Sequence, residues 1–547
     1  MKKNTILSIM TCAAMLLLTT ACSNDENSNP KEQPTQAVQF SFTNEDFGAD
    51  ETLSRATSAA ETKPQTVDLG DCEAEISVEN EPAVKTRGTM TNASGHYTIR
   101  AYQGGTMKGE MKGTFSGGNF TSDASSLKSM NLPNGTYDFI AFNDDVTING
   151  NELKVERTDV ETARMGITTT TITATPAKQM VNFTMKHVGA RLRTQFVCKK
   201  DIPENITATL EQTAANVIPT SVVYNPTTKA YTSTNGVMTA ETCNSPASTE
   251  NKYGASGFGR IYAYTSTSDY HYFLPTTEGS KLKLTFNAGT VFWKPLTGSL
   301  SQLNATLQMQ ANKSYVVKIK LKPLYTYLFH DGTTGFLKDK GTRTPVGIVI
   351  KPGLAVALND ANGGAKCMWD TNPATWNSQS NQTMYKTNFA TGYNTYNGEE
   401  ETWNPAYSYP THQIKGDIPT YTAIYKAGHY GQLLTSKGIP VTGNLLNRWF
   451  LPSYGEWKEA ITTLAFFNPS QTTNWAQYRE MYGAIVSEAF TQVGGDDLFP
   501  NQMLLYWSSS EYDGFYAVIL DTNTAYGIFR DWAKSNLHCY ARAFVRY

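Results

Sequence analysis

The chain has 547 residues, and 46 Lys and Arg against 48 Asp and Glu give a formal net charge of −2. This balance excludes the concentrated basic surface that nucleic-acid phosphates require, so we expect no nucleic-acid partner. A hydrophobic content of 40%, with 12% aromatic residues, excludes wholesale disorder. At about 100 to 200 residues per domain, the length predicts three or four folded units.

The first 21 residues have the pattern of an export signal. Lys2 and Lys3 precede an apolar run, Ile6 to Leu18, that is shorter than the roughly 20 residues a membrane-spanning helix needs. The small residues before Cys22 resemble the lipobox of bacterial lipoproteins, although threonine stands three places before the cysteine, where leucine is usual. The resemblance implies that Cys22 is acylated and anchors the chain to the outer membrane. The alternative is an ordinary secretory signal with an incidental cysteine.

Tryptophan use divides the remainder of the chain. Residues 22–36 are polar and contain proline, which predicts a flexible tether. Only one tryptophan precedes residue 325, and the others follow it: Trp369, Trp376, Trp403, Trp449, Trp457, Trp475, Trp507 and Trp532. Such an abrupt change in composition marks two kinds of domain. We therefore separate a part over 37–323 from a C-terminal domain over 324–547.

The part over 37–323 consists of short alternating segments between turn residues. HYTIRAY (96–102) alternates at period two, TYDFIAF (136–142) follows a Pro-Asn-Gly turn, and VNFTMKH (181–187) carries its apolar residues on one face. Helical periodicity is almost absent, which favours antiparallel β-sandwiches. The strand pattern breaks near Gly189, so we predict one sandwich over 37–189 and a second over 190–323.

The C-terminal domain mixes a helix with short strands. GIVIKPGLAVA (347–357) predicts two strands around a Pro-Gly turn. Residues 453–467 predict a helix, because Ser453 can cap it and Glu456 completes a capping box. Strand-like segments follow at 515–520, 525–529 and 540–547. The whole chain is thus expected to be mainly β, with an α+β domain at its end.

At this point the chain resembles the fimbrillin family, the pilus subunits and accessory pilins of Bacteroides-type bacteria. The resemblance covers residues 1–323 and rests on the lipobox and four strings: KTRGT (85–89), LPNGTYDFIAF (132–142), VNFTMKHVGARLRTQF (181–196) and NKSYVVKIKLKP (312–323). It implies two consecutive transthyretin-like, Greek-key sandwiches in a lipid-anchored, surface-exposed protein of the fimbrium. It also implies assembly with other pilus subunits by β-strand addition.

Fimbrillin-like subunits mature when a trypsin-like protease cuts after an arginine and releases the first strand. The resemblance makes Arg87 the expected cleavage site, with Arg55 as its rival. The open sheet edge would then accept an extended segment of a neighbouring subunit. The alternatives are an ordinary solvated arginine and an anchoring pilin that escapes cleavage.

The C-terminal domain resembles a second known fold. The strings WFLPSYGEW (449–457), YWSSSE (506–511) and ARAFVRY (541–547) are similar to those of C-type-lectin-like and formylglycine-generating-enzyme-like domains. Glu456 and Glu511 are candidates for a catalytic carboxylate pair, but a helix cap and the end of a serine turn explain them better. The three serines also lack the G-x-S-x-G context of a nucleophile.

Five cysteines lie beyond the expected anchor, so at least one thiol stays unpaired. Position suggests that Cys198 pairs with Cys243 and Cys367 with Cys539, although connectivity does not follow from sequence. A disulfide is a more economical use of Cys367 and Cys539 than formylglycine-generating chemistry. No Cys/His cluster has metal-ligand spacing, so we expect no metal, no cofactor and no enzymatic activity.

A long loop in the C-terminal domain interleaves asparagines with aromatic residues and predicts a ligand surface for a glycan or a protein of a host or bacterial surface: Trp376, Tyr385, Tyr393, Tyr396 and Trp403. The alternative is that these rings pack against the domain. Because a folded domain takes the place of a donor segment, we predict a tip or accessory pilin that accepts a donor strand and donates none. The alternative function is a non-pilus surface lipoprotein that binds glycans for nutrient capture.

Overall fold

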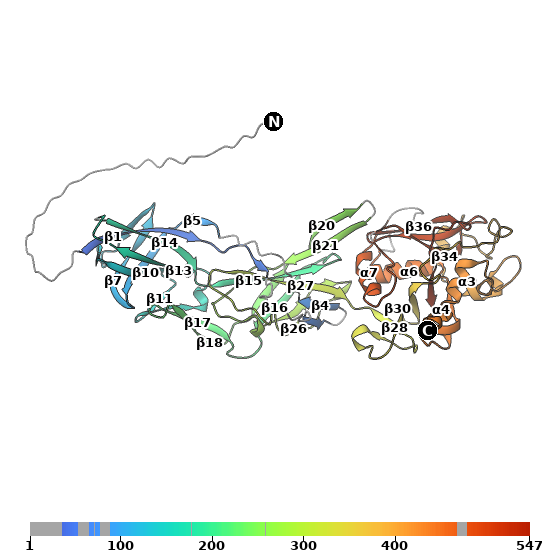
Figure 1. The fold of residues 1–547 in the computed structure, drawn as a ribbon, viewed down its shortest axis with the longest axis horizontal. Coiled ribbons are helices and arrows are strands. Elements are labelled where there is room, and N and C mark those ends of the chain that lie inside the picture. The colour runs from blue at the N-terminus through green and yellow to red at the C-terminus, as the bar shows by residue number, and fades with distance from the viewer. Residues whose placement is uncertain are drawn as a thin grey trace, which may run out of the picture.

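The computed structural model describes residues 35–52, 65–69, 72–76, 88–176, 178–256, 259–467, 479–500 and 502–547. Figure 1 shows three bodies in a row, with β1 and β10 in the first, β15 and β16 in the second, and the labelled helices α3, α4, α6 and α7 in the C-terminal body. The predicted lipid-attachment residue Cys22 and the predicted cleavage residues Arg55 and Arg87 lie outside the described residues.

The first body is built on a nine-stranded sheet in the order β5-β1-β14-β13-β10-β6-β7-β8, with β9 pairing with β1. Its apolar residues, including Phe42, Phe139 and Phe183, form one core. The predicted alternation of VNFTMKH is confirmed, because Val181, Phe183 and Met185 are all buried. The strands are β1 (Thr35–Glu45), β5 (Met90–Asn92), β6 (Gly95–Gln103), β7 (Thr106–Ser116), β8 (Asn119–Ser122), β9 (Met130–Pro133), β10 (Gly135–Asn143), β13 (Arg164–Ile172) and β14 (Lys178–His187).

Strand β10 is buried on both faces, which explains its continuous apolar run. Phe139 and Ala141 belong to the core just described, whereas Ile140 and Phe142 face a second core. A four-stranded sheet in the order β11-β12-β17-β18 contributes to that second core. Its strands are β11 (Thr147–Asn149), β12 (Glu152–Glu156), β17 (Ile218–Asn225) and β18 (Ala230–Gly236).

The second body packs an eight-stranded sheet on a four-stranded one. The larger sheet has the order β20-β21-β15-β27-β4-β3, with β2 on β27 and β22 on β15, and the smaller sheet has the order β19-β16-β23-β26. The strands are β2 (Glu51–Thr52), β3 (Gln65–Asp68), β4 (Cys72–Ile76), β15 (Ala190–Cys198), β16 (Ile206–Gln212), β19 (Glu241–Ser245), β20 (Thr249–Ser256), β21 (Gly259–Thr267), β22 (His271–Phe273), β23 (Leu282–Ala288), β26 (Ser299–Leu300) and β27 (Ser314–Pro323), with the small pair β24 (Thr290–Val291) and β25 (Lys294–Pro295) beside them.

The predicted boundary at Gly189 does not separate the strands of the first body from those of the second. The chain does pass from β14 to β15 there, and a Cβ on Gly189 would lie 2.5 Å from Cγ2 of Val160, so a glycine suits this close approach. However, β2, β3 and β4 precede the boundary and pair in the second body, while β17 and β18 follow it and pair in the sheet of β11 and β12. Each predicted range therefore supplies strands to its neighbour.

The alternation predicts purely antiparallel sheets, and this prediction is wrong. Strand β1 runs parallel to β14, and β15 and β2 run parallel to β27. In the first and second bodies, the last strand of the larger sheet (β14 and β27) therefore meets a parallel neighbour that comes from much earlier in the sequence. Alternation within one strand reports which face is buried and carries no information on the direction of a distant partner.

The C-terminal body contains a six-stranded sheet in the order β29-β28-β30-β31-β37-β32 and a four-stranded sheet in the order β33-β36-β35-β34. The strands are β28 (Thr326–Phe329), β29 (Thr334–Phe336), β30 (Pro345–Lys351), β31 (Leu354–Asp360), β32 (Trp449–Phe450), β33 (Arg479–Glu480), β34 (Leu504–Glu511), β35 (Tyr516–Thr522), β36 (Tyr526–Ala533) and β37 (Arg542–Val545). The helices are α1 (Phe389–Gly392), α2 (Gly398–Trp403), α3 (Thr422–Gly428), α4 (Tyr430–Ser436), α5 (Asn444–Asn447), α6 (Tyr454–Ala465) and α7 (Gly483–Thr491).

Two local predictions for this body are confirmed. Strands β30 and β31 flank the Pro-Gly turn, and α6 begins directly after its N-cap Ser453. The backbone N–H of Ser453 donates to Oε2 of Glu456 at 2.8 Å, which completes the predicted capping box. Within the described ranges, no helix is long and apolar enough to cross a membrane.

Candidate functional site

Strand β1 occupies an interior position in its sheet. It pairs in parallel with β14 from Ala37 to Glu45, and antiparallel with β9 near its start and with β5 near its end. Both sides of its backbone therefore take part in sheet hydrogen bonding along part of its length. We call this position, between β14 on one side and β5 and β9 on the other, the β1 slot.

The apolar side chains of β1 fill the aromatic core of the first body. Val38, Phe40 and Phe42 are 6%, 6% and 2% exposed. The ring of Phe42 stacks on those of Phe183 and Tyr97, with centroid distances of 5.1 and 4.8 Å. At roughly 1.5–3 kcal/mol for each fully buried apolar side chain, these three residues contribute about 5–9 kcal/mol. Removal of β1 would open an apolar slot in the middle of a sheet.

Strand β4 holds a comparable position in the second body. It pairs antiparallel with β27 on one side, from Cys72 opposite Pro323 to Ile76 opposite Ile319, and with β3 on the other. Cys72, Ala74 and Ile76 are buried in the core between the two sheets. We call this position beside β27 the β4 slot.

Both slots are filled by residues that precede the predicted cleavage sites or lie between them. A cut after Arg55 would separate β1 and β2 from the rest of the chain, whereas a cut after Arg87 would separate β1 to β4. Gly88 is buried, and a Cβ on it would lie 1.6 Å from the carbonyl oxygen of Asp46. The residue after Arg87 is thus packed against the chain that follows β1.

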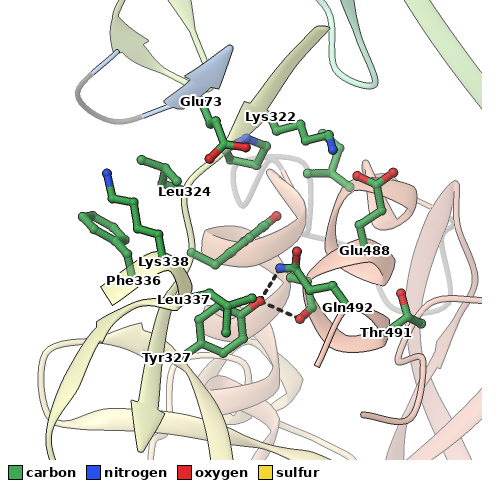
Figure 2. A pocket seen from close by; sticks show the side chains of 14 residues that line it. Glu73, Lys322, Leu324, Tyr327, Phe336, Leu337, Lys338, Glu488, Thr491 and Gln492 are labelled. Atoms are coloured by element: carbon green, nitrogen blue, oxygen red, sulfur yellow. Dashed lines mark hydrogen bonds between the residues drawn. The ribbon is translucent and has the colours of Figure 1, made fainter. Parts of the chain in front are cut away.

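A cavity of about 530 Å³ lies where β4 and the end of β27 meet the C-terminal body. Figure 2 shows Glu73, Lys322 and Glu488 along one side and Tyr327 and Gln492 on the other. The Tyr327 hydroxyl donates to the carbonyl of Ala489 at 2.7 Å and accepts from Nε2 of Gln492 at 2.5 Å. Burial raises the pKa of Tyr327 to about 12, so this hydroxyl stays protonated at neutral pH.

Polar contacts join the second body to the C-terminal body. Tyr482 donates to Asp201 at 2.7 Å, and Lys338 pairs with Asp68 of β3. Asp68 and Glu73 both belong to the part of the chain that a cut after Arg87 would separate. The same segment therefore supports the second body and contacts the C-terminal body.

The predicted serine turn at 508–510 is wrong, because Ser508 to Glu511 belong to strand β34 and are fully buried. Their polar groups are satisfied within the body: the Ser508 hydroxyl donates to the carbonyl of Val518 at 2.7 Å. Glu511 accepts from the backbone N–H groups of Ser380 and Asn381, at 2.8 and 2.7 Å, and pairs with the buried Lys534. A buried carboxylate thus fixes the long loop to β34.

Glu456 and Glu511 have different partners within the C-terminal body. The helix cap predicted for Glu456 is confirmed, whereas Glu511 lies in strand β34 and ends no turn. Glu456 caps α6 and pairs with Arg546 at 2.7 Å, and burial raises its pKa to about 7. Two charged residues near Glu511 escaped the sequence analysis: Glu401, whose carboxylate accepts from Ser509 at 2.5 Å, and Lys415. Burial raises the pKa of Glu401 and lowers that of Lys415. Neither residue stands in a pattern that signals burial.

The five predicted ligand-surface aromatics do not form one exposed surface. Tyr385 and Tyr393 are only 2% and 8% exposed, and Trp403 lies against Gly416 and donates its indole N–H to the carbonyl of Trp449 at 2.7 Å. Trp376 is partly buried, and Tyr396 alone is exposed. Packing against the domain is therefore the better explanation of this loop.

Exposed aromatic side chains occur instead at the hairpin between β34 and β35. Phe515 and Tyr516 are 55% and 38% exposed, and their ring centroids are 6.4 Å apart. Asp513, in the same turn, accepts from the backbone N–H groups of both residues and pairs with Lys386 at 2.8 Å. The sequence analysis missed this pair because an aromatic residue beside a strand is more often part of a core.

Neither predicted disulfide is formed in the structure, because Cys198, Cys243, Cys367 and Cys539 are free and buried. Cys198 and Cys243 are not opposite each other: the Cys243 sulfur lies 3.5 Å from the hydroxyl of Thr194, which is four residues, or about 13 Å, from Cys198 along β15. Cys367 and Cys539 do face each other, and their backbones hydrogen-bond at 2.9 Å. Burial raises the pKa of Cys367 to about 12, which does not suit a reactive thiolate.

Residues 71–338 match the family model described as Fimbrillin-like. This match takes in β4 and the remaining strands of the first two bodies, apart from β1 to β3, and extends into the start of the C-terminal body. The chain thus carries a fimbrillin-like region. Among curated proteins, none matches the chain.

Solved structures of fimbrial proteins resemble the chain at low identity. A fimbrial protein from Bacteroides ovatus is 12% identical, with a TM-score of 0.25 over 94% of this chain and 100% of that chain. A fimbrial protein from Bacteroides vulgatus is also 12% identical, with a TM-score of 0.26 over 42% of this chain and 92% of that chain. The fimbrial anchor protein Mfa2 from Porphyromonas gingivalis is 8% identical, with a TM-score of 0.21 over 46% of this chain and 78% of that chain.

Proposed function

We propose that this protein is a fimbrillin-like, cell-surface adhesin of the fimbrium that accepts donor strands and presents its C-terminal body for contact. One observation carries the proposal: β1 and β4 precede Arg87 and occupy interior sheet positions in two successive bodies. Their loss leaves open main-chain hydrogen-bonding groups on β14 and β27 beside apolar slots. An extended segment of another subunit would satisfy both.

The C-terminal body supports the role of a tip or accessory subunit. Strand β37 pairs with β31 on one side and with β32 on the other. All four residues of this strand are buried, so β37 is not available as a donor. The protein would accept a strand from a neighbouring subunit and donate none from this end.

Maturation and anchoring complete the proposal. Cys22 would carry the lipid that holds the protein at the outer membrane, and cleavage after Arg87, or alternatively Arg55, would free the slots. Since the non-covalent hold on β1 is strong, a cut alone does not empty the β1 slot. The incoming strand has to displace the severed segment.

The exposed pair Phe515 and Tyr516 is the best candidate for adhesive contact in the described part of the C-terminal body. Their rings offer a rigid apolar face beside the polar Asp513 and Lys386, a combination that suits stacking on a sugar or a protein surface. Full-length protein and the Phe515→Ala, Tyr516→Ala variant should differ in binding to a glycan array and to immobilised matrix proteins. Leu537→Ala, at a residue that is also 55% exposed, serves as the control.

Immunogold labelling tests the tip assignment. Antibodies against the C-terminal body should label the ends of fimbriae, or a few sites along them. Even labelling along the shaft would refute the tip assignment. Recovery of only intact, monomeric, polysaccharide-binding protein would favour the glycan-capture alternative, for which the exposed aromatic pair would serve equally well.

A further inference from the structure

One face of β27 carries a row of lysines beside the β4 slot. Lys318, Lys320 and Lys322 alternate along the strand, so their side chains lie on the same face. In the antiparallel register, Lys322 stands opposite Glu73 and Lys320 opposite Glu75. The outward face of the pair β4–β27 thus matches acidic residues to basic ones.

The lysine–glutamate contacts are close. Nζ of Lys322 lies 2.5 Å from Oε2 of Glu75, the diagonal neighbour, and Nζ of Lys320 lies 3.9 Å from the Glu488 carboxylate of the C-terminal body. Glu75 and Glu488 are 17% and 41% exposed, so the lysine row lies between two acidic groups that water only partly screens. Loss of β4 would leave Glu488 as the carboxylate that remains close to Lys320.

The inward face of β4 imposes a different requirement. Cys72, Ala74 and Ile76 are 4%, 0% and 4% exposed and belong to the core that includes Phe196 and Leu321. Ala74 stands directly opposite Leu321. Close packing around a fully buried alanine disfavours a larger side chain at this position.

We propose that the β4 slot selects a donor strand of alternating chemistry, with apolar residues at three inward positions, the smallest in the middle, and acidic residues at the two outward positions between them. This inference rests on the proposed strand acceptance and adds the chemistry of the partner. The partner is an extended acidic and apolar segment of another subunit. The resident sequence CEAEI (72–76) is the internal example of this pattern.

The charges act mainly on specificity. Partly exposed ion pairs contribute little affinity, typically below about 1 kcal/mol each. A donor with lysines at the outward positions would instead place like charges opposite Lys320 and Lys322, which rejects the wrong strand. Selection by charge also predicts that the discrimination weakens as salt is added.

The C-terminal body contacts β3 and β4, so it forms part of the surface that would accept a donor. Glu73 lines the interface cavity, and Asp68 of β3 pairs with Lys338. A donor that forms a hairpin, as β3 and β4 do, would replace both Glu73 at the cavity and Asp68 opposite Lys338. A donor of a single strand would replace only Glu73.

Strand exchange with synthetic peptides tests the proposal. Full-length protein, cut after Arg87 by an arginine-specific protease, is incubated with a large excess of fluorescent peptide of residues 65–76, with Cys72 replaced by the apolar Val in every peptide. Peptide retained with the protein is measured after size exclusion. We expect retention of the peptide with Glu73 and Glu75, and at least about tenfold lower retention of the Glu73→Lys, Glu75→Lys peptide at low salt. High salt should reduce this difference.

Two controls sharpen the result. An Ala74→Glu peptide should not be retained, because its carboxylate would enter the core. The Lys320→Glu, Lys322→Glu protein should retain the charge-reversed peptide and reject the original one. The main comparison uses the unaltered protein, so it does not depend on how this variant folds.

The outcomes separate the two proposals. If none of the peptides is retained, the β4 slot does not accept strands, and the proposed function fails for this body. If the original and the charge-reversed peptides are retained equally at low salt, strand acceptance stands and selection by charge is overturned.

Discussion

Nζ of Lys199 lies 2.7 Å from Oε1 of Glu488, and this ion pair joins the second body to the C-terminal body. Lys199 follows β15 of the second body, whereas Glu488 belongs to α7 of the C-terminal body. Burial would raise the pKa of Glu488, but Lys199 and Lys320 hold it below its ordinary value. The carboxylate is thus shared between two lysines of the second body.

Replacement of Glu488 by Gln should loosen this junction. Because its side chain is 41% exposed, we expect a loss of less than about 1 kcal/mol in stability but a larger spread of orientations between the two bodies. Small-angle scattering of the full chain measures that spread. Glu211→Gln, which breaks an ion pair within the second body, is the matched control. Equal scattering from both variants would contradict a role for Glu488 in orienting the C-terminal body.

Replacement of Phe42 by Ala should destabilise the first body. The ring is 2% exposed and stacks on Phe183, so we expect a loss of about 3–5 kcal/mol in unfolding free energy. Urea unfolding followed by circular dichroism measures it, and Met180→Ala, at a 51% exposed residue, should change little. After cleavage and strand exchange, the Phe42 variant should equal the parent protein. A persistent difference would show that β1 is not the strand that is replaced.

Arginine variants should reveal which bond is cut. In the native host, Arg87→Ala should retain the segment up to residue 87, while Arg55→Ala should leave a mature N-terminus at Gly88. Intact-mass measurement of the surface protein reads both results. A mature protein that begins at Ala56 would instead assign the cut to Arg55. In that case β3 and β4 would stay in place, and only the β1 slot would become available.

Stability should depend on pH through His271. Burial lowers its pKa, but contacts with Cys243 and Glu241 outweigh burial and raise the pKa to about 9. The folded pKa exceeds the ordinary 6.5, so His271 stabilises the fold fully below pH 6.5 and loses this effect as the pH rises through 9. We expect the His271→Gln substitution to lower the free energy of unfolding by up to about 3 kcal/mol at pH 6 and by much less at pH 9.5. Urea midpoints at both pH values test this.

His538→Gln provides the control, because His538 is exposed. If His271→Gln destabilises the protein equally at both pH values, its effect comes from packing alone. Arg157 also pairs with Glu241, at 2.7 Å, and competes with His271 for its carboxylate, so the pH dependence should persist in Arg157→Gln.

Oxidation should join Cys367 to Cys539 and leave Cys198 and Cys243 as thiols. The first two face each other in a hydrogen-bonded antiparallel pair, a geometry with a Cα separation of about 5.5 Å that a disulfide accommodates. Peptide mapping of the exported protein without reduction measures the bonds. A Cys198–Cys243 disulfide would contradict the register that places Cys243 beside Thr194.

Local patterns in the sequence predicted local structure well. The alternation around Phe183 identified β14, and Ser453 with Glu456 located the start of α6 within one residue. Those signals arise from neighbours along the chain. The places of β1 and β4 could not be predicted in this way, because their partners lie far away in sequence and no short-range feature specifies them.

The C-terminal body shows a second limit of prediction from sequence, which concerns burial. Ser508 to Ser510 look like a turn by composition, yet they are buried because Val518 and Glu401 satisfy two of their hydroxyls. Tyr385 looks like part of a binding loop, yet it packs on Gly392. Polar runs and aromatic loops become buried when distant partners complete their hydrogen bonds and contacts, and only the three-dimensional structure identifies these partners.

The pairing of β1 with β14 also affects how the chain is made. The hydroxyl of Thr43 donates to the carbonyl of Phe183 at 3.3 Å, across 140 residues of sequence. Contacts of such high order slow folding, because the intervening chain must be synthesised and its loop closed before they form. A precursor that passes through a membrane has to remain unfolded on the way. The strand that completes the first sheet is therefore also expected to keep the precursor competent for translocation.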